Sequence, residues 1–314
     1  MIEIKEILYD RYTRVGPAPV LKKMGVNNYG GECTPFVRNG RMMRVETVNV
    51  GDPYSPDFYC YCQVRDVAEN KVYPPFGKGH NFYSAYEEDG TVYVFCTNGS
   101  RGCWVIMFWS DDLIHWQEKT IIRREGWTFY NTSVCKGRDG KYVCAIEVML
   151  PREIAGVPFT IFFATSSDLM NWTMMDDEIH YSDKRYTACP ALRYLPSDDY
   201  YYMICLEALP LLRYAPYIYR TKDFMTWEIG LHNPVLWISE DDRRIMDGCS
   251  FPKEDEELIH TYMNINNCDI DLCEFEGKTY VDYLTGNQLG TNFACLAVYD
   301  GTMEQFLQHH FNAL

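Results

Sequence analysis

Two glutamates stand where a charged side chain is unexpected, each at the end of an apolar run. Glu147 follows Cys144-Ala145-Ile146, and Glu207 follows Met203-Ile204-Cys205-Leu206. A carboxylate in such surroundings costs free energy unless it is paired or used, and burial raises its pKa. One protonated and one ionised carboxyl group are what hydrolysis of a glycosidic bond requires. A structural role, in which each Glu pairs with an arginine or caps main-chain amides, is the alternative for both.

Other acidic and polar residues stand at the starts of further strand-like segments. Glu32 follows Gly30-Gly31, while Asp269 and Asp271 alternate along one segment and would share a face of a strand. The candidate catalytic residues are Glu147, Glu207, Asp269 and Glu32. The candidate substrate-binding residues are His80, Asn81, Asn131, Tyr186, Thr187, Asn267 and Asp271. For His80 the alternative is a hydrogen-bonded structural role.

The sequence carries no spacing typical of a metal or nucleotide site. H-x-x-x-H, C-x-x-C and EF-hand patterns are absent, and no glycine-rich phosphate loop follows a strand-like segment. Cys189 precedes Pro190 and is interpreted as a small buried residue rather than as a nucleophile. We therefore predict no metal and no cofactor.

One phrase recurs three times and indicates how the acids are positioned. It reads SDDLIHW at 110–116, SSDLMNW at 166–172 and TKDFMTW at 221–227, at intervals of 56 and 55 residues. Its Asp can accept hydrogen bonds from the main-chain amides of a turn, while its apolar residue and Trp fold back onto a sheet. The phrase therefore predicts a hairpin, and we assign no catalytic role to it.

A second recurrent unit consists of an apolar strand, a turn and an aromatic strand. It occurs at 32–46, 81–97, 131–147, 189–207 and 268–286. A period of about 50 to 55 residues with four short strands is typical of β-propeller blades. We predict an all-β, five-bladed β-propeller spanning residues 1–314 as a single domain, with one short inserted helix within 251–263. Residues 2–9 alternate like a strand and are expected to close the ring against the last blade.

Blade geometry predicts that acids remote in the sequence meet. The innermost strand of a blade starts at one face and the second strand ends at that face, so these positions gather around one mouth of the central channel. Crowded carboxylates raise one another's pKa values, which would supply the proton donor. We therefore expect hydrolysis of glycosidic bonds in an oligo- or polysaccharide.

The overall composition argues against several classes of partner. The chain of 314 residues has a formal charge of −15, which disfavours nucleic acid because phosphate binding needs Lys and Arg. No stretch approaches 18 apolar residues and no signal-peptide pattern opens the chain, so neither membrane nor export is predicted. The 13 cysteines lie mostly in apolar runs, which favours reduced buried thiols and a cytoplasmic location. No motif indicates an oligomeric state.

The strand-turn units followed by S-x-D-L-x-x-W resemble the five-bladed propeller glycosidases of the arabinanase, xylosidase and invertase type, families 43 and 32. The resemblance implies a carbohydrate substrate. In family 43 an Asp-Pro of the first blade supplies the base, a mid-propeller Asp tunes the pKa, and a Glu before Gly-Pro supplies the acid.

This sequence departs from the family pattern at each of those motifs. Thr34 precedes Pro35 where the family has Asp, and the third unit opens with Asn131. The fourth unit reads Thr187-Ala188-Cys189-Pro190 where Glu-Gly-Pro is expected, and only Asp269-Ile270-Asp271, in the fifth unit, keeps acids at the corresponding position. Two interpretations stay open besides hydrolysis: a carbohydrate-binding propeller without turnover, and a phosphate-dependent glycoside phosphorylase.

Overall fold

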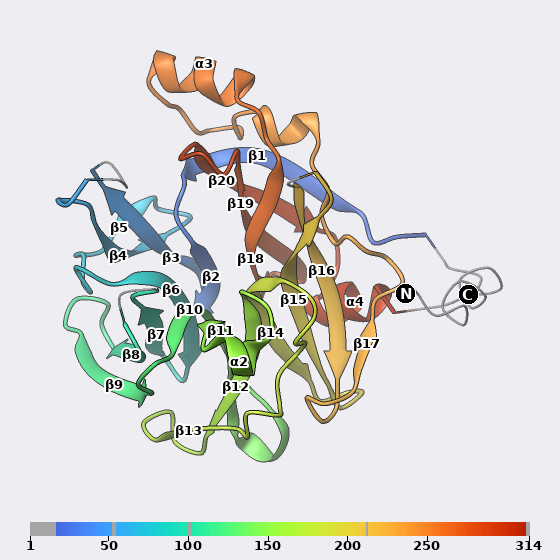
Figure 1. Ribbon diagram of the computed structural model, residues 1–314. Helices are drawn as coiled ribbons and strands as arrows, with labels where there is room; N and C mark the ends of the chain where they lie inside the picture. Colours follow the sequence, from blue (N-terminus) through green and yellow to red (C-terminus); the bar gives the residue numbers. More distant parts are fainter. Residues whose placement is uncertain (1–16, 52–54, 100–101, 212, 312–314) are drawn as a thin grey trace.

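The computed structural model describes residues 17–51, 55–99, 102–211 and 213–311. Within these ranges the chain is all-β in character, with 20 strands in three four-stranded sheets and one eight-stranded sheet. The sheets are arranged like blades around a common centre (Figure 1).

Each four-stranded sheet is an antiparallel meander of consecutive strands. The first contains β2 (Cys33–Arg38), β3 (Arg41–Val50), β4 (Tyr59–Asp66) and β5 (Lys71–Val72). The second contains β6 (Asn81–Glu88), β7 (Thr91–Thr97), β8 (Trp104–Ser110) and β9 (Gln117–Arg123). The third contains β10 (Thr128–Lys136), β11 (Tyr142–Leu150), β12 (Thr160–Ser166) and β13 (Trp172–Met174).

The eight-stranded sheet consists of two sets of four strands. One set contains β14 (Thr187–Leu195), β15 (Tyr200–Leu209), β16 (Arg213–Thr221) and β17 (Trp227–Ile229). The other contains β18 (Asn266–Phe275), β19 (Lys278–Gly286), β20 (Asn292–Tyr299) and β1 (Leu21–Tyr29). In the part of the chain that the structure describes, one parallel pair, Tyr214 with Asn266, joins the two sets. All five strand-turn-strand units predicted from the sequence form antiparallel hairpins.

Five strands line the centre of the molecule. They are β2, β6, β10, β14 and β18, and each lies against the next, with β18 returning to β2. This ring is what brings residues separated by more than 200 positions to one place.

The recurrent Asp/Trp phrase forms the turn between the third and fourth strands of three sets, as predicted. Its three Asp residues are Asp112, Asp168 and Asp223. Each uses Oδ1 to accept hydrogen bonds of 2.7–2.9 Å from two main-chain amides. The apolar residues that follow, Leu113, Leu169 and Phe224, are buried. The three turns therefore stabilise the sheets, which is the structural role predicted for this phrase.

The ring is closed by the strand nearest the described N-terminus. β1 pairs antiparallel with β20, and Figure 1 shows the two side by side in blue and red. A buried ion pair also joins the first and last sheets: Arg44 on β3 donates from Nε and Nη2 to the two carboxylate oxygens of Asp282 on β19, at 2.8 and 2.9 Å. Residues 2–9, which were expected to close the ring, lie outside the described residues.

The predicted inserted helix is α3 (Lys253–Thr261), which extends away from the sheets in Figure 1. Two further helices, α2 (Arg152–Ala155) and α4 (Met303–His309), show that the expectation of one helix was wrong. Short 3-10 turns occupy Arg138–Gly140 (η1) and Glu240–Arg243 (η2). The signal missed for α4 is a capping box, in which Thr302 Oγ1 accepts from the amide of Gln305 at 3.2 Å.

Apolar side chains packed between neighbouring sheets form the core. Of the 13 cysteines, 10 are buried, as their apolar sequence context predicted, and no disulfide joins any two of them within the described ranges. Among the described residues, no helix is long and apolar enough to cross a membrane.

His310 is expected to make the fold sensitive to acid. Its ring is 1% exposed, Nδ1 donates to the carbonyl oxygen of His232 at 2.8 Å, and burial lowers the pKa of His310 to about 4. At a pH below 6.5, the ordinary pKa of histidine, His310 binds a proton in the unfolded chain but stays neutral in the folded chain. The free energy of unfolding therefore falls as the pH drops from about 6.5 to 4. We expect a loss of about 3 kcal/mol from this residue.

Urea unfolding of wild type and His310→Asn at pH 7 and pH 4.5 measures this loss, since Asn keeps an N–H donor but does not titrate. The variant should lose less stability than wild type between the two pH values. Equal losses would show that His310 does not carry the effect.

Candidate functional site

The central ring encloses a small cavity near the start of its strands. It measures about 20 Å³ and is lined from all five inner strands and the residue preceding β2. The lining residues are Glu32, Cys33, Thr34, Tyr83, Ser84, Asn131, Thr132, Cys189, Pro190, Asp269, Ile270 and Asp271. The predicted convergence of strand starts is therefore seen for Glu32, Asn131, Asp269 and Asp271.

Four of the inner strands have irregular backbone close to this cavity. The pairing register shifts in β6, β10, β14 and β18 close to their starts. Three residues at these shifts have left-handed backbones without being glycine: Phe82 (φ 59°), Cys189 (φ 50°) and Asp269 (φ 48°). Such bulges re-aim side chains and free main-chain groups from the ladder, at a cost in strain that is common at functional sites.

Glu32 and Asp269 form an acidic pair across the cavity. Burial raises the pKa of Glu32, and the negative charge of Asp269 raises it further. Burial likewise raises the pKa of Asp269, against hydrogen bonds from the thiols of Cys268 and Cys189. Two buried carboxyl groups whose charges repel each other disfavour double ionisation, so the pair holds a proton more readily than either group would alone.

Glu147, near the end of β11, does not itself line the cavity, but it is hydrogen-bonded to two residues that do, Asn131 and Cys189. Its side chain is 3% exposed, and Oε2 accepts hydrogen bonds from the amide of Cys189 at 2.8 Å and from Nδ2 of Asn131 at 2.9 Å. Burial raises the pKa of Glu147 to about 8, and the charges of Asp269 and Glu32 act in the same direction. A pKa in this range favours the protonated form of Glu147 at neutral pH.

Cys189 is half-buried and lines the cavity, which differs from the buried position expected from the sequence. Burial and the charge of Asp269 hold the pKa of its thiol well above the ordinary value. A thiol that stays protonated is a poor nucleophile.

Glu207, the fourth candidate acid, lies elsewhere. It lies two residues before the end of β15 rather than at the predicted strand end, and its Oε2 accepts a hydrogen bond from Nη2 of Arg185, with which it forms an ion pair. Burial raises the pKa of Glu207, and Arg185 opposes that rise. Its cross-strand partner Thr187 is fully buried, and neither residue lines the cavity.

Two more candidates have structural partners. Asp271 reaches the cavity lining, but its carboxylate forms an ion pair with Arg193. Asn267 is buried away from the cavity, where its Nδ2 donates to Asp242 at 3.3 Å and its Oδ1 accepts from Asn264 at 3.0 Å.

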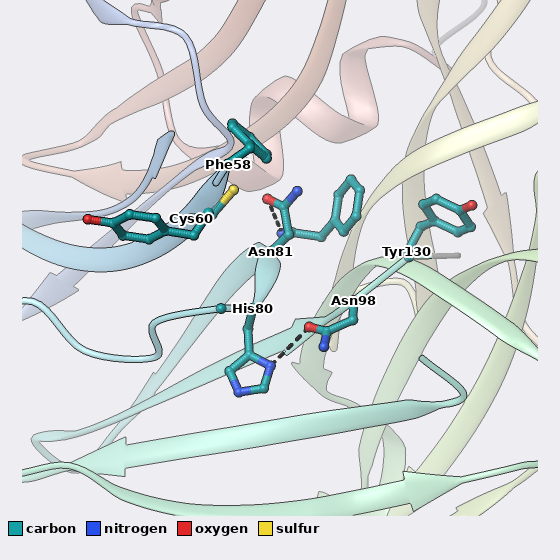
Figure 2. A pocket seen from close by; sticks show the side chains of 10 residues that line it. Phe58, Cys60, His80, Asn81, Asn98 and Tyr130 are labelled. Carbon is teal, nitrogen blue, oxygen red and sulfur yellow. Dashed lines mark hydrogen bonds between the residues drawn. The ribbon is translucent and has the colours of Figure 1, made fainter. Parts of the chain in front are cut away.

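A larger pocket of about 310 Å³ lies beside the acidic cavity. It is lined by Phe58, Tyr59, Cys60, Gly79, His80, Asn81, Phe82, Asn98, Gly99 and Tyr130 (Figure 2). Neighbouring residues of the same two strands line the two spaces, because Phe82 and Tyr130 line the pocket while Tyr83 and Asn131 line the cavity. The volume is within the range of small-molecule sites.

The pocket wall combines aromatic faces with amide groups. The rings of Phe82 and Tyr130 lie 5.3 Å apart at 64°, and Nδ1 of His80 is 2.9 Å from Oδ1 of Asn98. Gly99 (φ 55°) permits this packing, since a Cβ there would come within 3.0 Å of Tyr130 and 3.1 Å of Phe82. Of the predicted binding residues, His80 and Asn81 line this pocket rather than the cavity. Tyr186 packs against Phe159, which in turn packs against Tyr130 of the pocket wall.

Four residues of this pocket were not among the site residues predicted from the sequence: Phe58, Phe82, Asn98 and Tyr130. Phe82 and Tyr130 stand directly beside selected polar residues, Asn81 and Asn131, and strand-start aromatics could have been chosen on that basis. Phe58 and Asn98 lie in connections between strands, and no pattern in the sequence assigns them to this pocket.

Comparisons with known proteins agree with this architecture. No family model matches the chain, and no curated protein matches it by sequence. Among solved structures, the α-L-arabinofuranosidase PaAbf62A from Podospora anserina, in complex with cellotriose, is 9% identical with a TM-score of 0.59, over 92% of this chain and 95% of that one. An exo-1,5-α-L-arabinanase from a bovine ruminal metagenomic library is 10% identical with a TM-score of 0.54, over 88% and 94%.

A third solved structure, the RGII complex of BT0996, is 12% identical with a TM-score of 0.57, over 93% of this chain and 94% of that one. Similarity at such low identity shows the fold. The chain therefore has the β-propeller fold of the arabinofuranosidase and the arabinanase.

Proposed function

We propose that this chain is a single-domain, five-bladed propeller glycoside hydrolase that cleaves glycosidic bonds in oligo- or polysaccharides. The five blades would be the three four-stranded sheets and the two halves of the eight-stranded sheet, which share a single parallel backbone pair within the described ranges. The ring of five inner strands supports this count.

One observation supports the activity most strongly: an acid-lined cavity adjoins a pocket large enough for a sugar. A volume of about 20 Å³ is enough for one water molecule. The neighbouring pocket of about 310 Å³ offers aromatic and amide groups for a sugar ring. Two structural neighbours are complexes with carbohydrates, cellotriose and RGII, which belong to the same ligand class as the proposed oligo- or polysaccharide substrate.

The two acids of the cavity, together with Glu147 that is hydrogen-bonded to its lining, suggest a division of roles. Glu147, protonated at neutral pH, would donate a proton to the departing glycosidic oxygen. Glu32 and Asp269 would share one proton, and the ionised member would activate water in the cavity. Glu207 has no part in this scheme because it is paired with Arg185.

Turnover of a panel of aryl glycosides and oligosaccharides, with and without inorganic phosphate, tests the proposal. We expect release of free sugar at a rate that phosphate does not change. Thermal stabilisation by a sugar without any product would indicate a binding propeller, and phosphate-dependent product would indicate a phosphorylase. Either result would contradict hydrolysis.

A further inference from the structure

Within the described residues, the hydrogen bonds that Glu147 accepts both reach the same carboxylate oxygen, Oε2. Oε2 accepts from two N–H donors, the amide of Cys189 and Nδ2 of Asn131. A carboxyl oxygen that receives two N–H donors has no lone pair left for a proton. When Glu147 is protonated, the proton is therefore carried by Oε1.

The two donors come from different sheets. Asn131 lies on β10, one strand away from Glu147, whereas Cys189 lies on β14 of the neighbouring set. The register of β14 shifts between Ala188 and Ala191, and the left-handed backbone of Cys189 falls within that shift. Its amide therefore leaves the ladder and donates to Glu147 instead.

We propose that Asn131 and the main-chain amide of Cys189 are positioning groups, which together fix Oε2 of Glu147 and leave Oε1 to deliver the proton to the glycosidic oxygen. This inference rests on the proposed glycosidase function. The left-handed backbone at Cys189 then serves to place a main-chain donor beside Glu147. Asn131, which the sequence predicted only as a substrate-binding residue, acts through Glu147.

The same two donors tune the acidity of Glu147. Hydrogen bonds to Oε2 stabilise the ionised form and lower the pKa of Glu147, while burial and the charges of Asp269 and Glu32 raise it. The other titratable groups near Glu147 are Cys189, Tyr186 and Cys205. A proton donor works best when its pKa is close to the working pH, so the donors keep Glu147 from becoming too weak an acid.

Asn131→Leu removes one donor and tests the proposal. The pKa of Glu147 is read from the ¹³C carboxyl shifts of glutamate-labelled protein, assigned with Glu147→Gln, and kcat/KM is recorded against pH. We expect the variant to raise the pKa of Glu147 by about 1 pH unit and to move the alkaline limb of kcat/KM upward by the same amount. The matched control is Asn81→Leu, because Asn81 starts β6 and accepts from the amide of Phe82 rather than contacting Glu147. It should leave the pKa of Glu147 unchanged.

An unchanged pKa of Glu147 in Asn131→Leu would overturn the proposal, as would a raised pKa with an unmoved alkaline limb. If the pKa rises but wild type cleaves no glycoside in the panel, the proposed function fails while the positioning of Glu147 stands. Thermal unfolding of each variant shows whether it is folded, and Asn131→Ala replaces Asn131→Leu if the larger side chain is not accommodated.

Discussion

Glu147→Gln is expected to lower kcat/KM for glycoside hydrolysis by about 10²- to 10⁴-fold, the usual contribution of a general acid. The amide keeps the size of the side chain and an oxygen for the donors Asn131 and Cys189, but it has no acidic proton to give. Because burial makes the protonated carboxyl the stable form at neutral pH, the neutral amide should fold with little loss of stability. Steady-state kinetics together with thermal unfolding of the variant measures both effects.

Glu207→Gln is the matched control. Glu207 also ends an inner hairpin and is 4% exposed, but its carboxylate is paired with Arg185 outside the cavity. We expect its kcat/KM to stay within a few-fold of wild type, with some loss of stability from the weakened ion pair. A large loss of activity in Glu207→Gln with full activity in Glu147→Gln would reverse the assignment.

Arg44→Met is expected to lower the free energy of unfolding by about 3–5 kcal/mol. Arg44 and Asp282 are 4% and 0% exposed, so the substitution leaves a buried carboxylate without its cation. Because the pair joins the first sheet to the last, the loss should weaken closure of the ring. Urea unfolding at pH 7 measures the change.

The double variant Arg44→Met/Asp282→Leu separates ring closure from the cost of an unpaired charge. It should recover much of the lost stability, since an apolar pair of similar volume carries no desolvation penalty. A single variant as stable as wild type would show that the pair does not contribute to closure.

Local patterns in the sequence predicted the repeating part of the fold. The five hairpins and the three Asp/Trp turns follow from alternating apolar runs and turn residues, and they form as expected. Ring closure was not predictable in the same way. β1 is built from residues 21–29, LKKMGVNNY, which lack regular alternation and become a strand only because β20 offers an unpaired edge.

The site was predicted in part for a similar reason. Strand periodicity placed Glu32, Asn131 and Asp269 at strand starts, and the ring brings them together. The bulges at Phe82, Cys189 and Asp269 place non-glycine residues in the left-handed region. Because glycine is the usual sequence signal for such a backbone, the directions of these three side chains could not be predicted. The neutralisation of Glu207 was equally hidden, because Arg185 reaches it from a connecting segment 22 residues earlier.

A crystal structure of Glu147→Gln with an oligosaccharide substrate tests the central claim most directly. We predict a sugar ring against Phe82 and Tyr130, with the glycosidic oxygen in hydrogen-bond reach of the side chain at position 147 and the anomeric carbon facing Glu32 and Asp269. An oligosaccharide bound beside Arg185 and Glu207, or at the opposite mouth of the ring, would contradict this prediction.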